Sequence, residues 1–263
     1  MKSFRAVFSI FSFLLLGSTV LHAGQVANYE FQNTLASTNG AASLVDLGSG
    51  TYVTDSVFGE SCTVFSFAEQ TGLSLDSTDM FGSSAYSFAA LIRLAETDDY
   101  AKILDIHNRV DDEGLYARDN GLIFYDYYDN GLTQLSNDTW ARIVFAYDGT
   151  TLRGYVNGVE AFNEEEEVDY GDGAITSNTL FFFRDDFYTE DEENSAGRVA
   201  NIQLFDHALT GQEAADLVFS CANTPPPPTV DAVAIPTMST WGKIGLIFVL
   251  MLAGIGISRR RIN

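Results

Sequence analysis

The sequence is poor in basic residues, in histidine and in cysteine. It has 14 lysines and arginines against 36 acidic residues, which gives a net charge of −22 over 263 residues. Nucleic acid is therefore an unsuitable partner, because phosphate binding needs positive side chains. The two cysteines and three histidines are too few for a disulfide scaffold, a structural zinc site or histidine-rich metal chemistry. What is present is 46% hydrophobic and 13% aromatic residues, which excludes a disordered acidic chain.

The first 23 residues have the pattern of a secretory signal peptide. Lys2 and Arg5 precede a largely apolar run over residues 6–20, and Ala23 ends a small-residue cleavage site. The alternative is an uncleaved anchor, but the apolar run is short for a bilayer span. We expect cleavage after Ala23 and export through the inner membrane.

The C-terminus carries a motif, an apolar stretch and a basic end, in that order. The stretch covers residues 244–257, and three arginines follow at 259–261. This arrangement resembles the IPTLxxWG-type C-terminal sorting signals of Gram-negative bacteria, with Met238 in place of the leucine. The resemblance implies an exosortase-like protease as partner, a transient membrane anchor over residues 241–258, and transfer to the cell surface; the alternative is a plain anchor. The matching motif residues are Ile235, Pro236, Thr237, Trp241 and Gly242.

The segment between the two ends is more acidic than the whole chain. The terminal segments hold six of the 14 basic residues and no acidic one, which leaves a net charge of −28 for residues 24–234. Such a surface stays soluble by self-repulsion and suits salty surroundings or divalent cations. A run of prolines at 225–228 predicts a stiff linker. We therefore divide the chain into a signal peptide (1–23), one domain (24–222), a linker (223–234) and a sorting signal (235–263).

The domain has the local signals of an all-β fold. Short β-branched and aromatic runs are separated by turns, of which Asn120-Gly121, Asp148-Gly149 and Asn157-Gly158 are the clearest. Thr210 and Glu213 form a capping-box pattern that opens a short helix over residues 214–219. The sequence predicts a two-sheet antiparallel jelly roll with one terminal helix. The predicted strands include residues 85–94, 102–106, 114–118, 122–125, 140–147, 151–156, 180–183 and 198–205, the last with Ala200, Ile202 and Leu204 on one face.

The order of these segments is similar to that of the laminin-G-like, or concanavalin-A-like, domains of bacterial exported proteins. The resemblance starts at residues 26–31 and continues through Tyr86-Ser87-Phe88, Ile103-Leu104-Asp105, residues 154–159 and residues 183–186 to the segment 197–209. It implies a curved β-sandwich that binds sugars, proteins or calcium. We interpret the chain as a noncatalytic binding module for glycan or protein ligands in the cell envelope or extracellular matrix. A purely structural surface protein is an alternative.

A second alternative is a polysaccharide hydrolase or lyase of the same fold. The dense acidic run at residues 190–193 has the composition of a loop rather than of a strand that bears an acid/base pair. Asp105, His107 and Arg109 would share one face if their strand continued past Ile106. We interpret these three as a solvated strand end or the base of a hairpin, so no catalytic residue is predicted.

Calcium is the one cofactor that the sequence suggests. Six carboxylates lie between Asp185 and Glu193, and they repel each other unless a cation is bound. Calcium accepts six to eight oxygen ligands in flexible geometry. We predict a calcium site at Asp185, Asp186 and Glu193, with a solvated acidic hairpin as the alternative.

Cys62 and Cys221 are predicted to form a disulfide. The exported location is oxidising, and the first and last strands of a jelly roll commonly lie side by side. Two separate buried thiols are the alternative.

Overall fold

A computed structural model describes residues 24–219, apart from residues 83, 126–133, 166–172 and 190–191. The predicted signal peptide, linker, sorting signal and Cys221 lie outside the described residues. By its contacts the chain divides into residues 1–223 and residues 224–263, and every described residue belongs to the first unit. Within this described part, no helix has the length and apolar character needed to cross a membrane.

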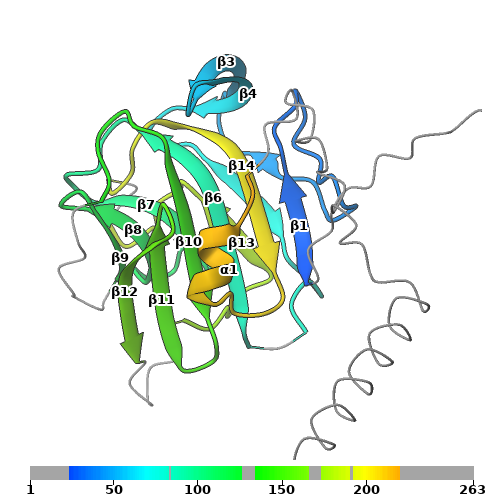
Figure 1. Cartoon of the computed structure of the whole chain (residues 1–263), viewed down its shortest axis with the longest axis vertical. Helices are drawn as coiled ribbons and strands as arrows, with labels where there is room; N and C mark the ends of the chain where they lie inside the picture. The colour runs from blue at the N-terminus through cyan, green and yellow to red at the C-terminus, as the bar shows by residue number, and fades with distance from the viewer. Residues whose placement is uncertain (1–23, 83, 126–133, 166–172, 190–191, 220–263) are drawn as a thin grey trace, which may run out of the picture. The chain divides into compact units, whose positions relative to one another are not determined.

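Two antiparallel sheets form a β-sandwich (Figure 1), as predicted. The larger sheet has the order β12-β11-β10-β6-β14-β4-β3, with β1 also paired to β14, and the smaller one has the order β2-β5-β13-β7-β8-β9. The larger sheet contains β1 (Gln25–Tyr29), β3 (Thr51–Val57), β4 (Glu60–Phe67), β6 (Tyr86–Leu94), β10 (Ala141–Tyr147), β11 (Thr151–Val156), β12 (Val159–Glu165) and β14 (Gly197–Phe205). The smaller sheet contains β2 (Val45–Asp46), β5 (Leu73–Asp76), β7 (Ala101–Asp105), β8 (Gly114–Arg118), β9 (Gly121–Tyr125) and β13 (Thr179–Phe182).

Aromatic rings from the two sheets meet in the core. Phe88 of β6 stacks on Phe182 of β13 with ring centroids 5.7 Å apart, and Phe124 of β9 stacks on Phe145 of β10 at 5.1 Å. All four side chains are buried. Burying each ring contributes roughly 1.5–3 kcal/mol, so these pairs stabilise the contact between the sheets.

The predicted hairpins are confirmed. Asp119 and Asn120 join β8 to β9 with φ angles of 51° and 59°, and Asn157 joins β11 to β12 at 53°. Aspartate and asparagine tolerate positive φ better than other residues with a side chain. The capping box is also present, because Thr210 accepts a hydrogen bond from the Glu213 amide.

Several strand boundaries differ from the sequence prediction by one residue, and one strand face and the start of the helix differ as well. Strand β7 ends at Asp105, one residue before the predicted end at Ile106. A bulge in β14 between Val199 and Asn201 moves Ala200 out of register. Ile202 and Leu204 therefore belong to the main core between the sheets, whereas Ala200 packs in a second apolar cluster. The buried members of this second cluster are Val57, Cys62, Val64, Leu91, Trp140 and Ala200. The helix α1 (Gly211–Asp216) begins three residues earlier than predicted.

The disulfide remains a prediction, with one supporting contact. Cys62 on β4 is fully buried in the second cluster, and Phe219 packs against that cluster. Phe219 precedes Cys221 by two residues, so the chain reaches the neighbourhood of Cys62 just before its predicted partner.

We expect the purified chain to take up no label when it is alkylated under denaturing conditions without reductant, and two labels after reduction. Intact-mass measurement distinguishes these states. Two labels without reductant would show that the cysteines are separate thiols.

Candidate functional site

A buried ion pair lies between β7 and the loop after β13. Lys102 is the only lysine between residues 24 and 234, and its Nζ lies 2.9 Å from Asp186 Oδ2 and 3.6 Å from Asp105 Oδ2. The side chains of all three residues are completely buried. Lys102 also donates to the Asp112 carbonyl oxygen at 3.2 Å, and its ammonium group lies 4.7 Å from the centre of the Tyr116 ring. The ammonium group is thus held by partners on several sides.

Asp186 fixes the loop that follows it. Burial alone would raise the pKa of Asp186, but the hydrogen bond and charge of Lys102 and two backbone N–H donors lower it below its usual range. Those donors are the amides of Tyr188 and Thr189, at 2.7 and 3.0 Å from Oδ1. An ionised Asp186 therefore orders the first turn of the loop.

Three carboxylates meet beside this pair, and we call Asp112, Asp185 and Glu193 the acidic cluster. One oxygen of each lies within 4.8 Å of the others. Asp185 Oδ2 accepts from Thr189 Oγ1 at 2.7 Å and from the Glu193 amide at 2.9 Å, while Tyr116 donates to Asp112 at 2.8 Å. These bonds orient the carboxylates toward one another.

The charge of the acidic cluster is only partly compensated by the described residues, because Lys102 lowers the pKa of Asp112 and of Glu193 less than burial and the neighbouring carboxylates raise it. Burial, followed by the charges of Asp112 and Asp185, raises the pKa of Glu193 to about 7. Burial also raises the pKa of Asp185 and of Asp112. Within the described part of the chain, Glu193 Oε2 is buried and has no hydrogen-bond partner. An orphaned oxygen among carboxylates fits a hard divalent cation such as calcium.

The structure brings together a different set of carboxylates from the one that the sequence predicted as calcium ligands. Asp185 and Glu193 lie together as predicted, but Asp186 points to Lys102 instead. Asp112 takes its place, from the loop between β7 and β8. The acidic run Asp111-Asp112-Glu113 is the signal that could have identified it. The alternative of a solvated acidic hairpin does not hold for Asp185 and Asp186, which are both fully buried, whereas Glu192 is exposed and residues 190–191 lie outside the described part of the chain.

The three residues of the catalytic alternative do not share a strand face. Because β7 ends at Asp105, His107 and Arg109 lie in the following loop. Asp105 accepts from the Arg109 amide at 2.9 Å. His107 is also buried rather than solvated.

Both ring nitrogens of His107 are occupied. Nε2 donates to the Ala174 carbonyl oxygen at 3.0 Å, and Nδ1 lies 3.0 Å from Asp111 Oδ1 and 2.8 Å from Glu113 Oε2. Burial lowers the pKa of His107, but the Asp111 charge and the hydrogen bonds with Glu113 and Asp111 raise it overall. Burial and Asp111 raise the pKa of Glu113 to about 7. His107 Nδ1 therefore lies within hydrogen-bond distance of two carboxylates.

Two aromatic rings project from the loop after β13, and we call Phe187 and Tyr188 the aromatic loop. Their exposed fractions are 66% and 77%. The Phe187 amide donates to the Arg109 carbonyl oxygen at 3.0 Å, and the Arg109 guanidinium lies 3.9 Å from the Phe187 ring centre. Arg109 Nε in turn donates to the Asp185 carbonyl oxygen. The exposed rings are thus carried by a backbone that buried residues fix in place.

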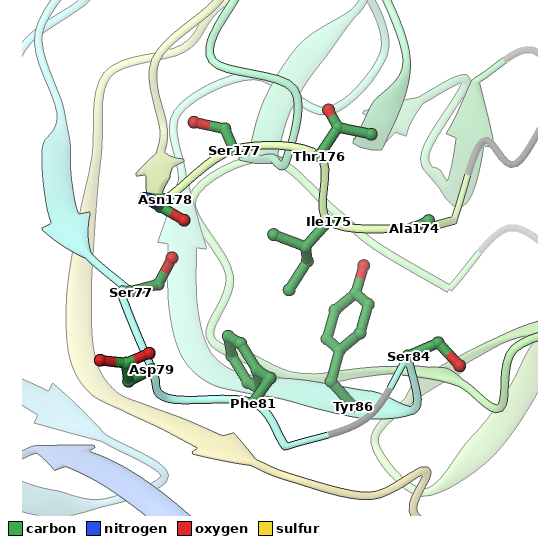
Figure 2. Close-up of a pocket in the computed structure, with 10 residues that line it drawn as sticks. All are labelled: Ser77, Asp79, Phe81, Ser84, Tyr86, Ala174, Ile175, Thr176, Ser177 and Asn178. Carbon is green, nitrogen blue, oxygen red and sulfur yellow. The ribbon is translucent and has the colours of Figure 1, made fainter.

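A pocket of about 260 Å³ lies at the other end of β13 (Figure 2). It opens between the loop from β5 to β6 and the segment that precedes β13. Figure 2 shows Phe81, Tyr86 and Ile175 directed toward its centre. The lining residues are Ser77, Asp79, Phe81, Ser84, Tyr86, Ala174, Ile175, Thr176, Ser177 and Asn178.

Solved structures of distant proteins share this fold. Domain 4 of AbnA, a GH43 extracellular arabinanase from Geobacillus stearothermophilus solved with arabinotriose, is 16% identical with a TM-score of 0.53, over 73% of this chain and 97% of that chain. A structure of botulinum neurotoxin type C, whose cell entry depends on two ganglioside molecules, is 14% identical with a TM-score of 0.54, over 74% of this chain and 50% of that one. The ligand binding domain of botulinum neurotoxin serotype D, solved with N-acetylneuraminic acid, is 13% identical with a TM-score of 0.52, over 73% of this chain and 50% of that chain.

The present chain spans about half the length of the neurotoxin chains that it matches. A comparison with curated protein sequences finds no match. Residues 67–215 match the family Laminin_G_3, described as the Concanavalin A-like lectin/glucanases superfamily. Since the match covers more than half of the sequence, the chain belongs to this family of concanavalin A-like domains.

Proposed function

We propose that this chain is an exported, noncatalytic glycan-binding module of the bacterial cell surface. The observation that carries the proposal is the aromatic loop, in which Phe187 and Tyr188 are largely exposed on a backbone held by Asp185 and Asp186. Exposed aromatic rings offer a flat apolar face against which the C–H face of a sugar packs. Because the loop is already ordered, binding costs little conformational entropy.

The structural comparisons support the choice of ligand class. Domain 4 of the arabinanase was solved with arabinotriose, and it matches over nearly its whole length. Of the two neurotoxins, type C depends on interaction with two ganglioside molecules for cell entry, and serotype D was solved with N-acetylneuraminic acid. We infer a glycan rather than a protein as the first ligand to test.

The noncatalytic part of the proposal rests on the contacts of His107. A general base must accept a proton from the substrate, whereas Nε2 of His107 donates to Ala174 and Nδ1 faces Asp111 and Glu113. The polysaccharide hydrolase or lyase alternative therefore lacks an available base at this position.

Calcium is proposed to bind the acidic cluster. Asp112, Asp185 and Glu193 would hold it, and it would supply the positive charge that these carboxylates lack. Asp185 accepts from Thr189 in the turn that carries the aromatic loop, so the chain's own hydrogen bonds link the acidic cluster to Phe187 and Tyr188. Export, removal of residues 1–23 and sorting through residues 235–263 complete the proposal; a structural surface protein is the alternative.

We expect Phe187→Ala and Tyr188→Ala, singly and together, to weaken glycan binding at least tenfold. Loss of either ring removes apolar contact with the sugar but leaves the backbone hydrogen bonds of the loop in place, and Phe187→Ala also removes the ring's contact with the Arg109 guanidinium. A glycan array, run with and without calcium, identifies the ligand, and isothermal titration gives the dissociation constants. Phe58→Ala is the matched control, because Phe58 is also exposed but lies in the turn between β3 and β4.

The same preparation separates the alternatives. New reducing or unsaturated ends after incubation with a polysaccharide panel, abolished by His107→Ala, would contradict the noncatalytic proposal. Self-association without saturable glycan binding would favour the structural alternative. Binding that is unchanged in both aromatic variants would remove the aromatic loop from the site.

A further inference from the structure

We infer that the pocket beside β13 binds a single uncharged sugar residue. This inference rests on the proposed glycan-binding function and adds a second, enclosed subsite to the open aromatic loop. The pocket is lined by two segments that are far apart in the sequence. One contributes Ser77, Asp79, Phe81, Ser84 and Tyr86, and the other contributes residues 174–178.

The size of the pocket limits its ligand. At about 260 Å³, it is smaller than the roughly 300–1,000 Å³ of pockets that bury drug-sized molecules. One sugar ring fits such a volume, whereas an oligosaccharide does not. We therefore expect the end of a glycan chain or a side branch to enter.

The inner wall is apolar and fixed. Phe81 packs against Tyr86 with ring centroids 5.5 Å apart, and Ile175 faces both rings in Figure 2. Tyr86 is 2% exposed, and its hydroxyl donates to the Gly173 carbonyl oxygen at 3.0 Å. This bond ties the strand β6 to the segment before β13, so the wall exists before a ligand binds. The C–H face of a sugar would pack here.

The rim of the pocket offers uncharged hydrogen-bonding groups. Ser77, Ser177 and Asn178 line it, and the Ser77 amide donates to the Asn178 carbonyl oxygen at 2.8 Å. Hydroxyl and amide side chains both donate and accept hydrogen bonds. They therefore match sugar hydroxyls, which also do both. Few polar groups around an apolar wall are typical of small-molecule sites.

The charge of the lining excludes anionic sugars. Among the described residues that line the pocket, none is basic, and Asp79 is the one charged side chain. A sugar carboxylate would lose its hydration and face this aspartate without a cationic partner. With a net charge of −28 over residues 24–234, the wider surface also repels anions. An uncharged pentose or hexose has no such cost.

Saturation-transfer NMR with the full chain tests the inference. The probes are D-glucose, D-galactose and L-arabinose as neutral sugars, and D-glucuronic acid and N-acetylneuraminic acid as anionic ones. We expect transfer to at least one neutral sugar and none to the anionic pair. Phe81→Ala should weaken binding of that sugar at least tenfold, and Asn178→Ala should weaken it several-fold, while Phe58→Ala leaves it unchanged.

Asn178 is exposed, so its variant keeps the test valid if Phe81→Ala disturbs folding. Equal transfer to anionic sugars, or neutral binding that both pocket variants retain, would overturn the pocket assignment and leave the glycan-binding function standing. Absence of transfer to every neutral probe would overturn it too, and the glycan array then judges the proposed function separately. The variants of Phe187 and Tyr188 should keep monosaccharide binding in the pocket.

Discussion

Replacing Lys102 with methionine is expected to lower the free energy of unfolding by about 3–5 kcal/mol. Methionine fills a similar volume but removes the charge that faces Asp186 and Asp105, both of which are completely buried. The carboxylates would then be buried without a counter-charge, and Asp186 would lose the contact that lowers its pKa. Denaturant titration, measured without divalent cations, gives the change directly, and the melting temperature should fall by roughly 10 °C.

A surface ion pair provides the matched control. Arg153 lies 2.8 Å from Asp148, with exposed side-chain fractions of 29% and 33%. Arg153→Met should cost less than about 1 kcal/mol, because water screens the pair. Adding Asp186→Asn to Lys102→Met should recover part of the loss, since it removes one of the stranded charges. A Lys102→Met protein within about 1 kcal/mol of the wild type would contradict the importance of this ion pair.

The hairpins could be predicted because their signals are local. Asn120 and Asn157 adopt positive φ within turns of a few residues, and each turn joins two strands that pair with each other. Thr210 and Glu213 likewise reach each other within one helical turn. In these places the sequence contains both partners of the interaction.

The ion pair and the acidic cluster could not be predicted in the same way. Lys102 and Asp186 are 84 residues apart in the sequence, and they meet because β7 pairs with β13. The sequence shows that both segments are strands, but it does not show which strands are neighbours. Asp112 was missed for this reason, and the burial of Lys102 follows from the same pairing.

Smaller errors came from irregular strands. Ala200 left the predicted face because β14 has a bulge next to Val199, and alternation cannot reveal where a bulge occurs. The shared face of the catalytic alternative does not form, because β7 ends at Asp105, four residues before Arg109. Asn108 and Arg109 both have positive φ, which ends the strand geometry.

Calcium is expected to raise the melting temperature of this chain, and more at pH 8 than at pH 5.5. For an extracellular site with a dissociation constant of about 0.1–1 mM, 10 mM calcium would add about 1.4–2.7 kcal/mol by linkage. That corresponds to roughly 3–10 °C. The carboxylates of Asp112, Asp185 and Glu193 must be ionised to bind the cation, and burial raises the pKa of each.

The sign of the pH effect without calcium follows from Glu193. Its pKa of about 7 in the folded chain exceeds the roughly 4.3 of an unfolded glutamate, so the folded state holds the proton more tightly. The contribution of Glu193 to stability is therefore fully present below about pH 4.3 and is lost as the pH rises to about 7. Glu113, also with a pKa of about 7, acts in the same direction.

Glu193→Gln should consequently stabilise the chain without calcium and destabilise it with calcium. Without calcium at pH 8 the variant should be more stable than the wild type, because a neutral amide replaces a carboxylate that faces Asp112 and Asp185. With calcium it should be the less stable of the two, because one oxygen ligand of the required charge is gone. Glu192→Gln, at the exposed neighbouring position, should show neither change. A calcium-induced rise in melting temperature that Glu193→Gln leaves intact would contradict the assignment of calcium to the acidic cluster. A stability difference between variant and wild type that changes sign when calcium is added would identify Glu193 as a cation ligand, because a residue that only supports the fold would not show it.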